Sequence, residues 1–104
     1  MKIAVYSLCR DRLSYSKIAF QSLREKAGVP FHHYVVDNGS QDGTVEWLEK
    51  EYKPMWLWPL DENMGISIAS NLALRAIFAS PEPPDLVLKI DNDCQCITPN
   101  ILSA

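Results

Sequence analysis

Hydrophobic residues gather in four short runs along the chain, and segments with helical spacing separate these runs. The runs are rich in β-branched and aromatic residues, as strands are, and they cover residues 2–8, 31–36, 55–60 and 85–90. Apolar residues recur every three or four positions over 14–27 and 45–52, and residues 68–79 are almost continuously apolar. This alternation predicts an α/β fold: a Rossmann-like, mostly parallel sheet of about four strands flanked by three helices.

The residues at the ends of these segments refine the prediction. Ser14 is a candidate N-cap of the first helix, and Gly28 follows its last turn. Pro59 cannot donate a backbone hydrogen bond, which indicates an edge strand or a strand end. Because residues 68–79 are apolar nearly all round, we expect this helix to be buried between layers.

Composition limits the classes of protein. The 104 residues, 47% of them hydrophobic and with a formal charge of −3, describe one domain over 1–104 with a single core. The acidic balance disfavours a nucleic-acid binder. Six of the ten basic residues lie within the first 26, so Arg10, Arg12 and Lys17 could attract an anionic ligand to one edge of the protein.

The N-terminal residues, the cysteines and the histidines limit the location of the protein and its metal content. The apolar run after Met1 is too short for a signal peptide or a membrane span, so we expect a cytoplasmic protein. Cys9, Cys94 and Cys96 are odd in number, which favours free thiols over a disulfide framework. Since His32 and His33 sit in a different segment from the paired cysteines, a four-ligand zinc site is disfavoured.

Polar residues follow the predicted strands. They are Cys9-Arg10-Asp11, Asp37-Asn38, Asp61-Glu62-Asn63 and Asp91-Asn92-Asp93. In an open parallel sheet, ligands bind in the crevice beyond the carboxyl ends of the strands. The sequence therefore predicts a crevice rich in oxygen ligands.

The pair Asp91 and Asp93 carries the strongest chemical signal. Alternate residues of an extended backbone share a face, and two carboxylates on one face repel unless a cation lies between them. Hard oxygen ligands suit Mg²⁺ or Mn²⁺. The alternative is that Asp91 caps a turn and Asp93 is solvated. A helix-loop-helix calcium site does not fit, because the sixth position from Asp91 is Cys96 and the twelfth is Leu102.

The segment over residues 37–44 is dense in turn-forming residues, and the need for a tight turn is by itself enough to explain its Asn-Gly and Asp-Gly pairs. The four glycines, at positions 28, 39, 43 and 65, form neither a dinucleotide-binding fingerprint nor a P-loop. A diphosphate bound in this crevice would need a divalent cation to neutralise much of its charge.

Three motifs together resemble one known family. They are Val35-Val36-Asp37-Asn38-Gly39-Ser40-Gln41-Asp42-Gly43-Thr44, then Glu62-Asn63-Met64-Gly65 with Asn71 six residues on, then Ile90-Asp91-Asn92-Asp93. Their order and spacing resemble those of the inverting glycosyltransferases of family 2, which have the GT-A fold. The resemblance extends over nearly the whole chain, and it implies the half of such an enzyme that binds the nucleotide-sugar donor, a UDP-, GDP- or dTDP-linked sugar.

The resemblance also implies roles for single residues. The first strand end, Ser7 to Arg10, would lie against the nucleotide, and Asp37 with Asn38 would hold the base or ribose. Asp42 would lie near the nucleoside, and the segment from Asn63 through Gly65 to Asn71 would close over the base. Asp91 would contact the ribose or the metal, and Asp93 would coordinate Mn²⁺ or Mg²⁺ on the donor's diphosphate. Gly65 also has a structural explanation as a helix-entry turn.

Two departures from the family limit what can be carried over. Many relatives have a basic residue immediately before the helix asparagine, whereas this chain has Ser70. Only residues 94–104 follow Asp93, and the resemblance assigns the acceptor site and the general base to later residues, so we expect both to be missing from these 104 residues. No catalytic base is therefore assigned.

Two other functions compete with glycosyl transfer. The chain could be an inactive relative that acts as a nucleotide-binding or interaction module, in which a homo-oligomer or another partner covers the truncated sheet. The candidates for that surface are Trp47, Trp56, Trp58 and residues 97–102, although we expect at least two of the tryptophans to pack in the core. A metal-dependent nucleotidyltransferase also has acidic strand ends, but this chain lacks a glycine-rich basic loop after the first strand.

Overall fold

The computed structural model describes residues 2–92, and it confirms the predicted α/β architecture. Strands and helices alternate along the chain. The elements are β1 (Ile3–Cys9), α1 (Leu13–Lys26), β2 (His32–Asn38), α2 (Thr44–Trp47), the π-helical turn η1 (Leu48–Tyr52), β3 (Trp56–Leu60), α3 (Ile66–Phe78) and β4 (Leu86–Lys89).

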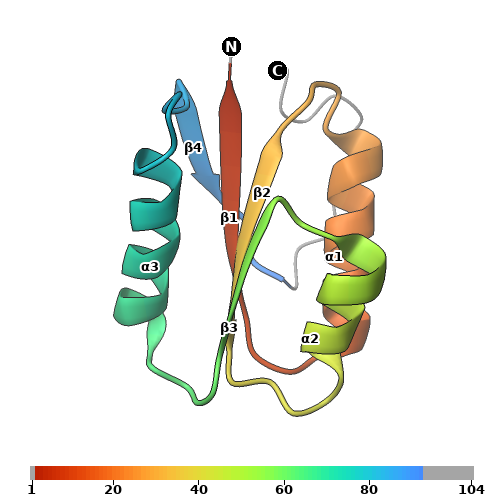
Figure 1. Cartoon of the computed structure of the whole chain (residues 1–104). Helices are drawn as coiled ribbons and strands as arrows, with labels where there is room; N and C mark the ends of the chain where they lie inside the picture. The colour runs from red at the N-terminus through yellow and green to blue at the C-terminus, as the bar shows by residue number, and fades with distance from the viewer. Residues whose placement is uncertain (1, 93–104) are drawn as a thin grey trace.

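The four strands form one parallel sheet in the order β3-β2-β1-β4. All four therefore end at the same edge, which is the lower edge in Figure 1. The central strand β1 sets this alignment, with Cys9 opposite Asp37 of β2 and Tyr6 opposite Lys89 of β4. Strand β3 lies at the outer edge, as Pro59 predicts.

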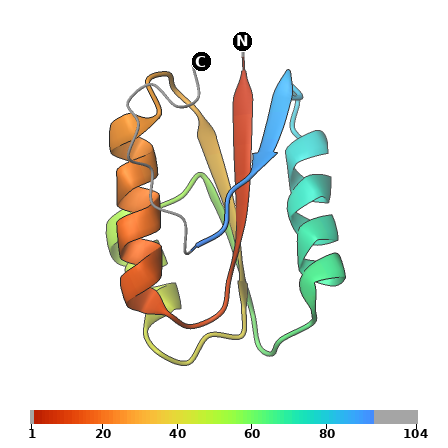
Figure 2. The same cartoon turned by 180° about the vertical axis from the view of Figure 1, so that it is seen from behind.

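Helices cover both faces of the sheet. Figures 1 and 2 show α1 and α2 on one face and α3 on the other. Alternate residues of β1 and β2 point to opposite faces. Residues on the α1 side pack with Phe20, Leu23 and Leu48, whereas those on the α3 side pack with Ala69, Ala73 and Ile77. The single small core is thus two thin layers on either side of the sheet.

Helix α3 is not buried all round, so that expectation from residues 68–79 is wrong. Only Ala69, Ala73 and Ile77 are buried, because their spacing of four places them on one stripe against the sheet. Ile68 and Phe78 are 47% and 58% exposed. An apolar sequence therefore makes a helix that is covered on one side.

Helix α1 begins one residue before the predicted cap. Arg12, and not Ser14, occupies the N-cap position, and no side chain of its own segment caps the helix. The predicted end is close to the observed one, since Gly28 adopts φ of +80° directly after the C-cap Ala27.

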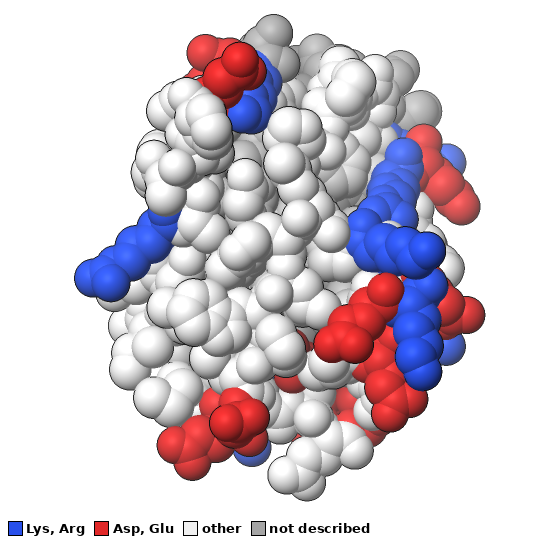
Figure 3. Space-filling model, viewed as in Figure 1, with Lys and Arg blue, Asp and Glu red and all other residues white. Residues whose placement is uncertain are grey.

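Charged residues are unevenly distributed over the surface. In Figure 3, Lys, Arg, Asp and Glu side chains gather over the α1 and α2 side of this view, and the centre is largely uncharged. Within residues 2–92, no helix combines the length and apolar character needed to cross a membrane.

Candidate functional site

An open cleft of about 350 Å³ lies at the edge where the strands end. It is built from the ends of β1, β2 and β4 and from the segment that leads into α3. Its lining residues are Leu8, Cys9, Arg10, Arg12, Asn38, Asn63, Ile66, Lys89, Asp91 and Asn92. Residues 80 positions apart in sequence thus share one site, because the parallel sheet brings their strand ends together.

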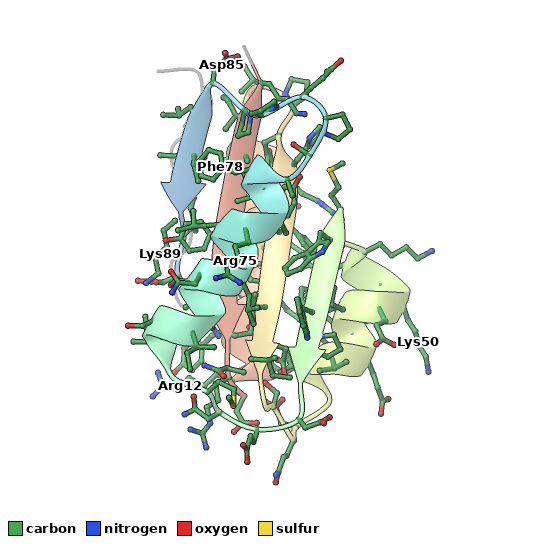
Figure 4. The ribbon with its side chains drawn as sticks, turned by 60° about the vertical axis from the view of Figure 1, so that its left-hand side comes forward. Arg12, Lys50, Arg75, Phe78, Asp85 and Lys89 are labelled. Atoms are coloured by element: carbon green, nitrogen blue, oxygen red, sulfur yellow. The ribbon has the colours of Figure 1, made fainter. Side chains whose placement is uncertain are left out.

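The charged groups of the described lining are mainly cationic. Arg10, Arg12 and Lys89 contribute three positive charges, and Asp91 contributes one carboxylate. All four residues are exposed. In Figure 4, Arg12 lies at the lower end of the molecule and Lys89 at the tip of β4, whereas Asp85 marks the opposite end of that strand. This charge balance suits an anionic ligand.

The aspartate that ends β2 is used to build the neighbouring loop. Asp37 is fully buried, and its two carboxylate oxygens accept hydrogen bonds from the backbone N–H and hydroxyl of Ser40, at 2.8 and 2.6 Å. Burial raises the pKa of this carboxyl, and the Ser40 hydrogen bonds oppose the rise. The side chain therefore fixes the loop from within.

The same serine ties this loop to the turn after β1. Ser40 Oγ accepts the backbone N–H of Asp11 at 2.7 Å, and Asp11 Oδ1 accepts the backbone N–H of Gln41 at 2.8 Å. Asp11 and Arg12 both have positive φ, 54° and 58°, which is unfavourable for residues with a Cβ. The hydrogen bonds hold this strained turn, from which Arg10 and Arg12 reach the cleft.

Asn38 connects β2 to the segment before α3. Its Oδ1 accepts the N–H of Met64 at 2.7 Å, and its Nδ2 donates to the carbonyl oxygen of Gly65 at 3.3 Å. The adjacent Gly39 has φ of +84°, and a methyl group there would lie 2.8 Å from the carbonyl carbon of Glu62. Only glycine therefore allows these two loops to come together.

Asp42 caps two helices. Its Oδ2 accepts the N–H of Leu13, the first residue of α1, at 2.9 Å, while Oδ1 accepts the N–H and hydroxyl of Thr44 at the start of α2. Desolvation works against the charge, but these hydrogen bonds lower the pKa of Asp42 below its usual value. This remote cap explains why α1 begins without one of its own.

The structure brings together only some of the predicted nucleotide-binding residues. Arg10, Asn38, Asn63 and Asp91 line the cleft. Ser7, Asp37, Asp42, Gly65 and Asn71 are not among the lining residues. Their predicted nucleotide contacts stay predictions.

Three of the residues outside the lining have a definite structural place. Ser7 is fully buried in the core. Gly65 has φ of +84° and open space where a Cβ would lie, so its conformation, and not a close approach within the protein, requires glycine. Asn71 is exposed on α3.

The described lining of the cleft offers a divalent cation few protein ligands. Asp91 is the carboxylate that the described lining offers, and Asp93 lies outside the described residues. Within 2–92, no three His, Cys, Asp or Glu side chains lie close enough to hold a metal. Mg²⁺ and similar ions are often bound by one or two carboxylates with ligand phosphates and water, which is compatible with Asp91 at the rim.

Cys9 does not supply a reactive thiolate here. Its side chain is fully buried, and burial raises the pKa of the thiol to about 12. The prediction of free thiols is confirmed for Cys9; Cys94 and Cys96 lie outside the described residues.

Sequence reasoning placed Asn92 in the crevice but missed Lys89 and Ile66 as lining residues. Lys89 precedes Asp91 by two positions, so the two-residue period of a strand places both on one face. That alternation was visible in the sequence. Ile66 follows a predicted motif, but its apolar side chain does not indicate a ligand contact.

Comparisons with known proteins agree with this geometry. The family model described as glycosyl transferase family 2 matches residues 8–102. A comparison with curated proteins found no match.

Similar folds occur among solved structures. S. aureus TarS is 27% identical, with a TM-score of 0.71 over 89% of this chain and 17% of that chain. S. aureus TarS 1-349 in complex with UDP-GlcNAc is 26% identical, with a TM-score of 0.72 over 89% and 27% of the two chains. The mannosyltransferase PcManGT from Pyrobaculum calidifontis, in complex with GDP-Man and Mn²⁺, is 22% identical, with a TM-score of 0.71 over 90% and 28%. The present chain thus spans less than a third of each.

The contact at Gly39 predicts a difference between two glycines of one loop. Gly39→Ala and Gly43→Ala both place a methyl group at positive φ, which costs about 1–2 kcal/mol. At Gly39 the methyl also meets the backbone of Glu62, whereas at Gly43 the closest atom is 3.8 Å away. We expect Gly39→Ala to lower the free energy of unfolding by about 1–3 kcal/mol more than Gly43→Ala in urea titrations. Equal losses would contradict this contact.

The double cap at Asp42 predicts a pH-dependent loss of stability. Asp42→Ala should lower the free energy of unfolding by about 1 kcal/mol at pH 7. Because the folded-state pKa is lowered, this contribution is present above the unfolded pKa of about 3.9 and is lost as the pH falls through the folded value. Urea unfolding at pH 7 and pH 3 measures the difference. Asp61→Ala, which removes another exposed carboxylate, is the control and should change stability little at either pH.

Proposed function

Since the chain belongs to glycosyl transferase family 2, we propose that its cleft binds the nucleoside diphosphate of a nucleotide-sugar donor for glycosyl transfer to an acceptor. The fold supports this proposal, because TarS, whose structures include complexes with UDP and UDP-GlcNAc, shares it over 89% of this chain. The chain corresponds to 28% or less of those proteins, so complete turnover, the sugar and the acceptor are part of the proposal.

The observation that carries the proposal is the charge of the cleft. Arg10, Arg12 and Lys89 converge with Asp91 at the carboxyl edge of the sheet. A diphosphate is an anion that cationic side chains attract, and a carboxylate beside them is unfavourable for such a ligand unless a cation bridges the two. The mixture of charges is therefore better explained by an anion that arrives with a metal ion than by an anion alone.

Individual residues then take different parts of the donor. Asn38 and Asn63 lie on the β2 and α3 side of the cleft. Their amide oxygens already accept backbone N–H groups, so the N–H donors that their amide groups keep would bond the base or ribose. The cations from β1 and β4 would hold the phosphates. Asp37 would act within the protein by fixing the loop, since Ser40 occupies both of its oxygens.

A divalent cation would be held by Asp91, together with Asp93 in the portion of the chain outside the described residues. When bound, Mn²⁺ or Mg²⁺ would supply Lewis-acid stabilisation of the leaving nucleoside diphosphate. The Mn²⁺ in the PcManGT complex supports this choice of ion for the fold. Asp91 is exposed at the rim, which leaves its oxygens accessible to such an ion.

Calorimetric titration with UDP, GDP and dTDP, each with and without Mn²⁺, tests the proposal. We expect at least one nucleotide to bind more tightly with Mn²⁺. Asp91→Asn should weaken the Mn²⁺-dependent binding by about tenfold or more, because contacts to charged groups contribute about 1.5–3 kcal/mol. Asp85→Asn changes a carboxylate at the far end of the same strand and should leave binding unchanged. A folded protein that shows no metal-dependent binding of any of the three would refute the donor site.

The second candidate function is assembly with another protein surface. Large apolar side chains are exposed on α3: Ile66, Ile68 and Phe78 are 67%, 47% and 58% exposed. Of the predicted tryptophans, Trp58 is 44% exposed and Trp56 is half-buried. Trp47 is only 5% exposed because it packs with Phe20 and Tyr52, so this candidate belongs to the core.

Light scattering coupled to size exclusion tests this candidate. If the exposed apolar side of α3 associates, the molar mass should exceed that of the 11.8 kDa monomer and rise with concentration. Phe78→Ser should return it to the monomer value, whereas Arg75→Ser on the same helix should not. A monomer at all concentrations would count against assembly.

A further inference from the structure

Three buried polar side chains form a continuous chain through the core. Ser7 on β1, His33 on β2 and Tyr52 in η1 are 0%, 3% and 3% exposed. Ser7 Oγ lies 2.8 Å from His33 Nε2, and His33 Nδ1 lies 2.5 Å from the hydroxyl oxygen of Tyr52. Burying three polar groups in so small a core is unfavourable unless each finds its partners.

The donors and acceptors of this chain can be assigned from one end. The Ser7 hydroxyl donates to the carbonyl oxygen of Ile90 at 2.6 Å, which uses its only hydrogen. Ser7 must therefore accept the Nε2–H of His33, and the unprotonated Nδ1 accepts the hydroxyl of Tyr52. Burial, with a smaller effect of Arg24, lowers the pKa of His33 to about 3, so the imidazole is neutral as this assignment requires.

Packing around the chain keeps its members in place. The Phe20 ring meets His33 edge-on at 4.7 Å and lies 5.2 Å from the Tyr52 ring, while the Arg24 guanidinium lies 3.7 Å above the outer side of Tyr52. The rotamers of His33 and Tyr52 are therefore fixed by aromatic neighbours, and the hydrogen bonds have a constant direction from η1 toward the end of β4.

The series of hydrogen bonds from Tyr52 through His33 to Ser7 ends at the carbonyl oxygen of Ile90, the residue before Asp91. The paired register of β1 and β4 stops at Tyr6 opposite Lys89, and the next N–H, that of Ile90, donates to the Tyr6 carbonyl at 3.0 Å. With its carbonyl held by Ser7, Ile90 has both main-chain polar groups fixed. The backbone that leads to Asp91 at the rim of the cleft thus depends on a side chain buried in the core.

We propose that Ser7, His33 and Tyr52 are positioning residues that set the place of Asp91 in the cleft by holding the Ile90 carbonyl. The proposal deepens the donor-binding function and rests on it for its effect on ligand affinity. Tyr52 acts at a distance: its hydroxyl keeps His33 in the Nε2–H tautomer, and this tautomer leaves the Ser7 hydrogen for Ile90. Without that hydroxyl, His33 could take the other tautomer and accept the Ser7 hydrogen, which would release the carbonyl.

The variants Ser7→Ala and Tyr52→Phe test the two ends of the chain, with Tyr34→Phe as control. Tyr34 is a buried tyrosine of β2 on the opposite, α3 face, at 5% exposure. We expect both test variants to weaken Mn²⁺-dependent binding of UDP or GDP by about tenfold, as losses of outer-shell support typically do. Binding without Mn²⁺ should change less than twofold. A purely structural role would lower the stability of the test variants and of the control without this selective change.

Amide NMR gives a readout that does not require nucleotide binding. In Tyr52→Phe, which removes a single oxygen from the core, the resonances of Ile90 and Asp91 should shift, and the ¹⁵N signals of His33 should report a change of tautomer. Tyr34→Phe should leave these signals unchanged. If wild-type protein bound no nucleotide, the donor site would fail while this measurement still decided the positioning role. Unshifted Ile90 and Asp91 amides in Tyr52→Phe would overturn the proposal.

Discussion

The pairing of β1 with a parallel strand on each side is the constraint from which the site follows. Because β1 is bonded to β2 and β4, and β2 to β3, four chain segments that are distant in sequence turn back at one edge. The register places Cys9 beside Asp37, and Asn38 beside Leu60, so the loops after these strands must meet. A ligand at this edge therefore touches residues whose positions are set by backbone hydrogen bonds across the whole sheet.

Polar side chains then fix the loops at this edge. Several residues that look like ligand contacts in the sequence bond the backbone of a neighbouring loop or helix in the structure. Asp37, Asp42 and Asn38 each satisfy backbone N–H groups of a neighbouring loop or helix. Such groups would be unsatisfied otherwise, because loops that meet at a sheet edge lack ladder partners. Asp37 and Asp42 thus build the loops around the cleft, and the charge of its described lining is mainly that of Arg10, Arg12 and Lys89.

The sequence predicted the fold well because its strands alternate so regularly, and it predicted the site less well for a physical reason. Strands and helices can be recognised from the spacing of apolar residues within a segment, because that spacing reflects which of its side chains are buried. Hydrogen bonding of a carboxylate depends on what lies opposite it. Asp42 is 29 residues from Leu13, and only the folded loop shows that it caps α1. The burial of α3 was over-estimated for the same reason. The apolar residues of a segment do not indicate how many faces of the helix other elements cover.

Ser7 is a buried residue that bonds the backbone leading to the cleft. The resemblance implies a nucleotide contact for Ser7, which stays a prediction, and in the structure its buried side chain bonds His33 and Ile90. A buried hydroxyl and imidazole are costly to desolvate, and the hydrogen bonds of the fully paired series offset that cost. The last of these bonds falls on the Ile90 carbonyl, where the pairing of β1 with β4 ends and Asp91 begins the cleft. The hydrogen bonds that make the burial of these polar groups tolerable are therefore the same ones that would position Asp91.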